Sequence, residues 1–156
     1  MAKILILGGG FGGLIAAERL SAALMGEHEI TLVSPRRRFT FYPSLVRLAF
    51  GDLDPEDVSF DLAEKLAQLG VRFIEGEMLD IDTANKTVHI TGDDVAGELF
   101  YDYLVIATGR RLATESVPGF FEYSHHLLGT GAALKFGEAV NNFKKGRIVI
   151  GLCPDG

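Results

Sequence analysis

The N-terminal part of the chain alternates between two hydrophobic patterns. Residues Lys3–Leu7 (KILIL) form a short apolar run that ends at glycine, which predicts a strand buried on both faces of a parallel sheet. From Phe11 to Met25 the apolar residues recur at helical spacing, and Gly26 ends the pattern. Glu29–Val33 (EITLV) is a second β-rich run. These residues therefore predict a strand-helix-strand unit with a right-handed crossover.

Between Ser34 and Phe60 the regular pattern is lost. Prolines and a glycine interrupt this stretch, which is rich in aromatic and leucine side chains. Its apolar content is too high for disorder, and long ordered loops are usually functional. We therefore expect an ordered segment folded over a site, with a short helix that begins at Ser44.

The remaining pattern predicts further strands and helices. A helix over Leu62–Leu69 is closed by Gly70, and a strand follows over Val71–Ile74. Glu77–Ile81 and Thr87–Thr91 are then expected to form an antiparallel hairpin, with which a strand at Leu99–Tyr101 pairs. The last predicted elements are a buried strand over Tyr103–Ala107, a helix over Ala132–Phe143 and a strand over Arg147–Ile150. The predicted fold class is α/β: a Rossmann-like parallel sheet with helices on both faces and an inserted antiparallel β-hairpin or meander.

Composition narrows the function classes. The 156 residues are 47% hydrophobic and 23% charged, which fits one soluble α/β domain. A net charge of -6 argues against a nucleic-acid partner, and Arg36–Arg38 is the only run of three consecutive basic residues. A single cysteine, Cys153, excludes an internal disulfide and a cysteine-cluster metal site. The apolar run at the N-terminus is too short to span a bilayer, so we expect a cytoplasmic protein.

His125 and His126 are the only adjacent histidines. Paired histidines can bind metal, but no cysteine or carboxylate cluster lies near them in the sequence. We therefore expect them to be structural or surface residues and expect no metal site.

A glycine-rich loop is the strongest candidate for a binding site in the sequence. Gly8, Gly10 and Gly13 form a GxGxxG motif directly between the first strand and the first helix, with Phe11 and Gly12 inside it. The first glycine permits a tight turn, the second lets a pyrophosphate approach the backbone, and Gly13 lets the helix pack on the strand. The helix N-terminus supplies about half a positive charge. A simple turn does not need glycine at all these positions, so a dinucleotide site is favoured over a plain connection.

The residue expected to bind the ribose departs from the fingerprint. An Asp or Glu is usual about 20 residues after the glycines, whereas the second strand here ends at Ser34, followed by Pro35 and three arginines. A serine hydroxyl can hydrogen-bond a ribose, and arginines can accommodate a 2′-phosphate. These residues alone leave NADP and FAD both open.

Several segments together resemble a known family. They are the glycine loop, Ser34-Pro35, Tyr42-Pro43-Ser44, Gly76-Glu77, Tyr101 to Gly109 (YDYLVIATG) and Val117-Pro118-Gly119. In this order they are similar to the pyridine nucleotide-disulfide oxidoreductase superfamily, and within it to the sulfide:quinone oxidoreductase and type II NADH dehydrogenase branches. The resemblance covers nearly the whole chain and favours FAD over NADP.

The resemblance also implies roles for particular residues. The first strand-helix-strand unit would hold the ADP part of FAD, and the residues after Ser34 and Pro35 would run beneath the adenosine; Arg36 and its neighbours would either contact it or form a solvated patch. The backbone at Met78 would meet the adenine. The residues expected beside the flavin or pyrophosphate are Phe41, Pro43, Ser44, Ala107, Thr108 and Gly109. None of them is an acid-base catalyst, so no catalytic residue is assigned.

The same resemblance predicts the domain organisation. Residues 1–112 would be the N-terminal part of the FAD-binding domain, and residues 113–156 the crossover and the start of a second dinucleotide-binding domain, whose first strand Gly146–Gly151 resembles. Complete members of the family return later to finish the first domain. We therefore expect a fragment with a partly walled FAD site that is inactive alone.

The implied function is transfer of electrons from sulfide or a related reductant, through FAD, to a quinone at the membrane face, in a protein that can be a homo-oligomer. Sulfide-oxidising relatives use cysteines near the flavin. Cys153 falls a few residues early for this role, and no cysteine occurs near Leu127 or Leu128, so a bystander role is favoured.

Two alternatives remain: an NADH:quinone oxidoreductase of type II, and a non-catalytic module that senses NAD(P) or FAD. The aromatic segment argues against the sensor, which needs no wall facing a flavin.

Overall fold

The computed structural model describes residues 1–92, 96–110 and 117–151. Two compact units account for them: Met1–Phe39 with Phe60–Gly109, and Thr40–Ser59 with the described part of Arg110–Gly156. The predicted boundary between residues 112 and 113 lies outside the described residues and stays a prediction.

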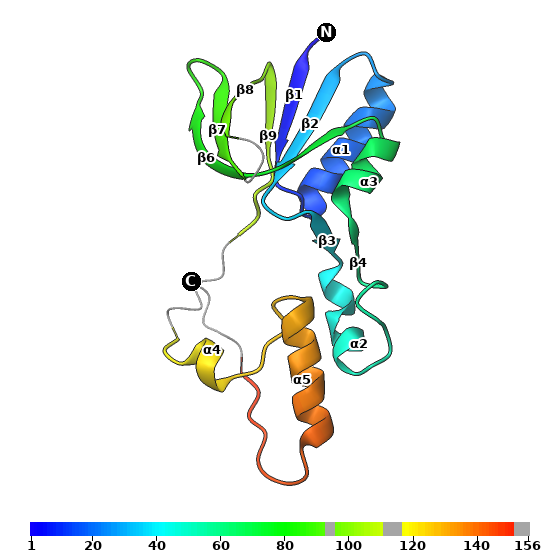
Figure 1. The fold of residues 1–156 in the computed structure, drawn as a ribbon, viewed down its shortest axis with the longest axis vertical. Helices are drawn as coiled ribbons and strands as arrows, with labels where there is room; N and C mark the ends of the chain where they lie inside the picture. The colour runs from blue at the N-terminus through cyan, green and yellow to red at the C-terminus, as the bar shows by residue number, and fades with distance from the viewer. Residues whose placement is uncertain (93–95, 111–116, 152–156) are drawn as a thin grey trace. The chain divides into compact units, whose positions relative to one another are not determined.

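A four-stranded parallel sheet forms the centre of the first unit (Figure 1). The strand order is β5 (Arg72–Glu75), β2 (Glu29–Ser34), β1 (Lys3–Leu7), β9 (Tyr103–Ile106), and every pair is parallel. Helix α1 (Phe11–Leu24) joins β1 to β2. The predicted strand-helix-strand unit and the α/β fold class are confirmed.

The two faces of this sheet are covered differently. On one face Ile4 and Ile6 of β1 pack with residues of α1 and of α3 (Leu62–Gln68). On the other face Leu5 and Leu7 pack against an antiparallel sheet. Its strands are β6 (Glu77–Asp82), β7 (Thr87–Thr91) and β8 (Gly97–Phe100).

The expectation of helices on both faces is therefore wrong for the described residues, where helices cover one face and the meander covers the other. An apolar strand shows that both of its faces are buried, but it does not specify the kind of element that buries them. The meander itself was expected, and its third strand pairs with β7 over Thr87–Ile90.

The irregular segment after β2 is ordered, as predicted. Short strands β3 (Arg38–Thr40) and β4 (Ser59–Asp61) pair at its two ends, and this ribbon was not expected from the pattern. Between them lie a 3-10 turn η1 (Tyr42–Ser44) and helix α2 (Leu45–Ala49). The helix begins one residue after the predicted start.

The second unit is built around α2 and α5 (Thr130–Asn142), with the short helix α4 (Phe120–Tyr123) before α5. Ala133 of α5 packs with Leu45, Leu48 and Ala49 of α2. A side chain at Gly137 would overlap the carbonyl oxygen of Ala49, so this glycine lets the two helices approach closely.

The predicted strand over Arg147–Ile150 is not a strand in the structure. A strand needs a neighbour that satisfies its backbone groups, and no described strand pairs with this segment. Val149 and Ile150 are each 92% exposed. None of the helices in the described residues has the length and apolar character that a bilayer-spanning helix needs.

Asp61 links the end of β4 to the start of α3. Its Oδ1 accepts a hydrogen bond from the backbone N–H of Glu64 at 3.1 Å, which caps the helix. Its Oδ2 accepts one from Nε of Arg37 at 2.6 Å. The Arg37 hydrogen bond, followed by the Glu64 amide, lowers the pKa of the Asp61 carboxyl below its usual value.

We expect this carboxyl to make stability depend on acid pH. A lowered folded-state pKa contributes stability above the ordinary Asp value of about 3.9, and that contribution is lost as pH falls through the folded value. Asp61→Asn should therefore be less stable than the parent protein at neutral pH, and the gap in melting temperature should close on acidification toward about pH 2. A gap that stays constant from neutral pH to that value would contradict the assignment.

Candidate functional site

The glycine loop lies at the carboxyl edge of the parallel sheet. Gly8 follows β1 directly, and its N–H donates to the carbonyl of Val33 at 2.8 Å. The N–H of Ala107, just after β9, donates to the carbonyl of Leu7 at 2.8 Å. The loop therefore begins where the ends of β1, β2 and β9 meet, which is the edge where parallel α/β sheets bind ligands.

Two glycines are needed for this junction to close. Gly8 has φ +110°, and a Cβ atom there would overlap the carbonyl oxygen of Ala107. A Cβ atom at Gly13 would overlap the carbonyl oxygen of Gly8 itself. The first and last glycines of the motif thus have the structural roles that the sequence predicts.

Gly10 is different, because no heavy atom lies within 4 Å of the place where its Cβ would be. Its φ of -83° suits any residue. Gly10, Phe11 and Gly12 are all exposed. Protein packing therefore does not explain the glycine at position 10, and the outer side of the turn has room for a ligand.

The start of α1 suits an anion. The first amides of a helix have no acceptor within the helix. At Gly10 no side chain caps them, and the first turn carries no acidic residue. Together with the helix dipole, these amides can bind a diphosphate without a basic side chain.

Ser34 is placed at this edge but its hydroxyl is engaged locally. The buried Oγ donates to the carbonyl of Arg36 at 3.1 Å and accepts from the N–H of Arg36 at 3.2 Å. A hydroxyl has one proton to donate and two lone pairs. In this geometry Ser34 can accept a further hydrogen bond, for example from a ribose hydroxyl.

The arginines after Ser34 separate into different environments. Arg37 is held by Asp61, as described above, so it takes part in the fold. The side chain of Arg36 is exposed, as is Pro35 before it. Contact of Arg36 with an adenosine stays a prediction.

Three further residues predicted for the site, Ala107, Thr108 and Gly109, follow β9 at the same edge of the sheet as the glycine loop. A Cβ at Gly12 would lie 3.5 Å from the Cβ of Ala107. Gly109 has φ +75°, and it and Thr108 are exposed. The backbone of Ser34 accepts from the N–H of Gly76 at 3.0 Å, just before the strand that carries Met78.

Met78 lies at an irregularity of the meander, because the β6–β7 register shifts between Met78 and Asp80. Its partly buried side chain packs against the core between the parallel sheet and the meander. Phe41 precedes η1, and Pro43 and Ser44 lie in it, all in the second unit. Placement of Phe41, Pro43, Ser44 or the Met78 backbone against a cofactor therefore stays a prediction.

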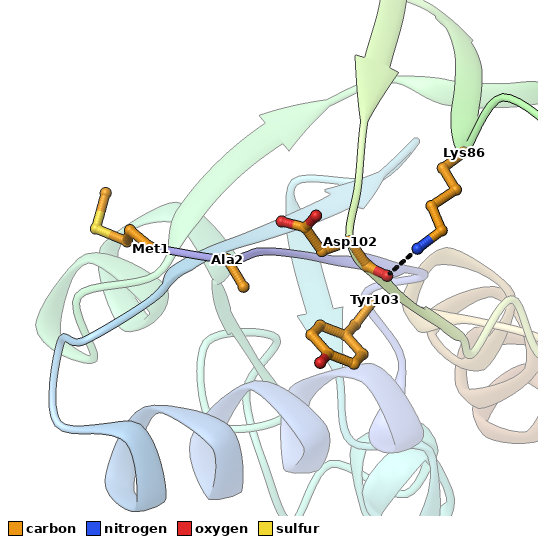
Figure 2. Close-up of a pocket in the computed structure, with 5 residues that line it drawn as sticks. All are labelled: Met1, Ala2, Lys86, Asp102 and Tyr103. Carbon is orange, nitrogen blue, oxygen red and sulfur yellow. Dashed lines mark hydrogen bonds between the residues drawn. The ribbon is translucent and has the colours of Figure 1, made fainter.

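A cavity of about 420 Å³ lies at the opposite edge of the sheet (Figure 2). It is lined by Met1, Ala2, Lys86, Asp102 and Tyr103, and Nζ of Lys86 donates to the carbonyl of Asp102 at 3.4 Å. Met1 and Ala2 precede β1, Asp102 and Tyr103 lie before and at the start of β9, and Lys86 directly precedes β7. Parallel sheets bind ligands at the carboxyl ends of their strands, so we assign this cavity no part in the site.

His126 has a structural environment. Its ring stacks on Phe120 with centroids 5.4 Å apart, and its Nδ1 accepts from the N–H of Leu128 at 3.3 Å. Among the described residues, no three His, Cys, Asp or Glu side chains are grouped to hold a metal ion. Cys153 lies outside the described residues.

Phe39 and Phe60 were not expected at the site. Phe39 contacts the ring of Phe11 in the glycine loop, and Phe60 contacts Phe39. The only signal in the sequence was that the irregular segment between Ser34 and Phe60 is rich in aromatic residues. Nothing in the sequence shows that β3 and β4 pair and bring them to the start of α1.

The parallel sheet and its glycine loop define a Rossmann-like α/β protein. A model of the pyridine nucleotide-disulphide oxidoreductase family matches residues 2–151. The chain therefore belongs to this family, as the motifs predicted.

Similar proteins support the two predicted branches. The chain is 38% identical over 125 residues to demethylphylloquinone reductase NdbB of Synechocystis sp., covering 78% of this chain and 31% of that protein. It is 35% identical over 157 residues to the sulfide-quinone reductase of Aquifex aeolicus, covering 99% and 35% respectively.

Two solved structures resemble this chain in fold. The sulfide:quinone oxidoreductase from Aquifex aeolicus superposes with a TM-score of 0.79 at 33% identity, covering 90% of this chain and 32% of that chain. NDH2 from Plasmodium falciparum in complex with NADH superposes with a TM-score of 0.71 at 28% identity, covering 87% of this chain and 28% of that chain. The chain spans about a third of the length of the curated relatives described above.

We expect Gly13→Ala to destabilise the fold, because its methyl group would overlap the carbonyl oxygen of Gly8. Overpacking of this kind costs about 1–3 kcal/mol, measurable by urea denaturation. Gly131→Ala in α5 is the matched control, since no heavy atom lies within 4 Å of its Cβ position. An alanine there should be neutral or stabilise by up to about 1 kcal/mol. Equal stability of the two variants would show that Gly13 is not required for packing.

Proposed function

We propose that this chain binds FAD through its glycine loop, and that the protein passes electrons from a reduced donor through FAD to a quinone. The observation that carries the proposal is the start of α1: a helix N-terminus with no side-chain cap, at the carboxyl edge of the sheet, with open space at Gly10.

The residues present fit a dinucleotide. The amides from Gly10 to Gly13 would bind the diphosphate. Ser34, Pro35 and Arg36 would lie along the adenosine, and the backbone of Met78 would meet the adenine. In the first unit, Ala107, Thr108 and Gly109 would lie beside the pyrophosphate or the flavin. For Phe41, Pro43 and Ser44 of the second unit, a place beside the flavin stays the prediction made from the family resemblance.

When bound, FAD supplies the oxidation-reduction chemistry. The contribution of this chain is to bind and orient it, with backbone amides rather than charged side chains at the diphosphate. No residue of the site is proposed as a proton donor or acceptor.

The relatives' names support the acceptor. One is a demethylphylloquinone reductase and another a sulfide-quinone reductase. For the donor we propose sulfide or a related reductant. NADH is the second candidate, favoured by the likeness to NDH2 solved with NADH. Because quinones are apolar, the protein would work as a peripheral protein at the cytoplasmic face of a membrane.

Gly10→Ala tests the cofactor site without disturbing the fold. Its methyl group meets no protein atom but would stand where a diphosphate approaches the backbone. We expect FAD affinity, measured by quenching of flavin fluorescence, to fall about tenfold, which corresponds to about 1.4 kcal/mol. The melting temperature without FAD should stay close to that of the parent protein.

Gly131→Ala again serves as the control and should bind FAD like the parent protein. Unchanged FAD affinity in Gly10→Ala would contradict the proposed site. A colourless parent protein that binds NADPH instead of FAD would favour the nucleotide-sensing alternative.

The donor is decided by anaerobic mixing of the FAD-loaded full-length protein with sulfide or with NADH. We expect sulfide to bleach the visible flavin absorption, because reduction removes the absorption of the oxidised ring. Bleaching by NADH and not by sulfide would replace the proposed donor with NADH. Addition of a soluble quinone analogue should then restore the absorption.

A further inference from the structure

The glycine loop offers only one side chain for packing. Of the residues from Gly8 to Gly13, Phe11 alone is not glycine. Glycine has the greatest backbone freedom, and α1 lacks a side-chain cap and an acidic residue in its first turn, two usual devices that hold a helix start. The orientation of the first amides of α1 therefore depends strongly on what holds Phe11.

An aromatic stack of Phe11, Phe39 and Phe60 provides this contact. The rings of Phe11 and Phe39 meet edge to face with centroids 5.0 Å apart. Phe39 and Phe60 stack with centroids 4.9 Å apart and planes inclined by 25°. Phe39 is 5% exposed, whereas Phe11 and Phe60 are 41% and 38% exposed. The middle ring is thus fixed in the core, and the outer rings pack on it.

The stack connects the helix start to ordered elements. Phe39 lies in β3 and packs in the core with Ile6 and Leu62. Phe60 lies in β4, which pairs with β3 (Figure 1) and leads through Asp61 into α3. Loss of the Phe60 ring would remove one of the contacts that keep Phe39 in place against Phe11.

We propose that Phe39 and Phe60 are positioning residues for the diphosphate site: through the ring of Phe11 they hold the first amides of α1 in the orientation that binds the cofactor. The identity of that ligand rests on the proposed function. Preorganised donors bind more tightly because less order must be imposed on binding.

Phe60→Leu tests the proposal, because it keeps an apolar side chain at a partly exposed position but removes the ring. Aromatic pairs of this kind correspond to about a three- to tenfold effect. We expect the FAD dissociation constant of Phe60→Leu to rise by this factor. The backbone N–H of Leu14 donates to the carbonyl of Gly10 at 3.0 Å. In protein without FAD, hydrogen exchange of this amide with solvent should be faster in Phe60→Leu by a similar factor.

Two controls separate positioning from general stability. Phe60→Tyr keeps the ring and should restore both FAD affinity and Leu14 exchange. Phe100→Leu removes an exposed ring on β8, far along the chain from the stack, and should leave both unchanged.

A double variant tests whether the two outer rings act together. Phe11→Leu combined with Phe60→Leu should weaken FAD binding by less than the product of the two single effects, because both act through one contact.

The outcomes are distinct. Equal exchange of Leu14 in Phe60→Leu and the parent protein overturns the inference whether or not FAD binds. Faster exchange with unchanged FAD affinity overturns it as well. Faster exchange in a protein that binds no FAD supports the positioning of the helix start and overturns the proposed function instead.

Discussion

The structure of the site depends on a close approach of three backbone segments, which is possible only without side chains at Gly8 and Gly13. A Cβ at Gly8 would overlap the backbone after β9, and one at Gly13 would overlap Gly8. This approach brings the start of α1 against the ends of β1 and β9. The first amides of α1 therefore lie at the edge of the sheet where ligands of parallel α/β proteins bind.

The same arrangement explains how an acidic chain can suit the anionic cofactor that we propose. With a net charge of -6, recognition cannot rest on an overall positive field. Helix amides act over a short range and carry no net charge, so they suit a diphosphate locally. Within the basic run Arg36–Arg38, Arg37 is bound to Asp61 in the fold. The open space at Gly10, which packing does not require, is the feature of this loop that points to a ligand.

Stability and site geometry are coupled at the start of α1. The helix lacks a side-chain cap, which removes a usual source of local stability but leaves its amides available. The aromatic stack of Phe11, Phe39 and Phe60 packs against this turn from the side of the core. Apolar contacts can hold the turn without competing for its N–H groups, because aromatic rings take no conventional hydrogen bond from them.

By itself the sequence determined the glycine loop and most of the strands and helices, because apolar periodicity and glycine spacing are local consequences of backbone geometry. It did not determine the β3–β4 pair, and it predicted a strand over Arg147–Ile150 that the structure lacks. It also determined the family. Only the tertiary structure decided what covers each face of the sheet, since an apolar strand such as β1 is equally buried under helices or strands. Likewise, the exposure of Val149 and Ile150 and the stacking of Phe39 on Phe60 depend on which distant segments pair. Such pairing is decided by contacts far apart in the chain, which local patterns do not encode.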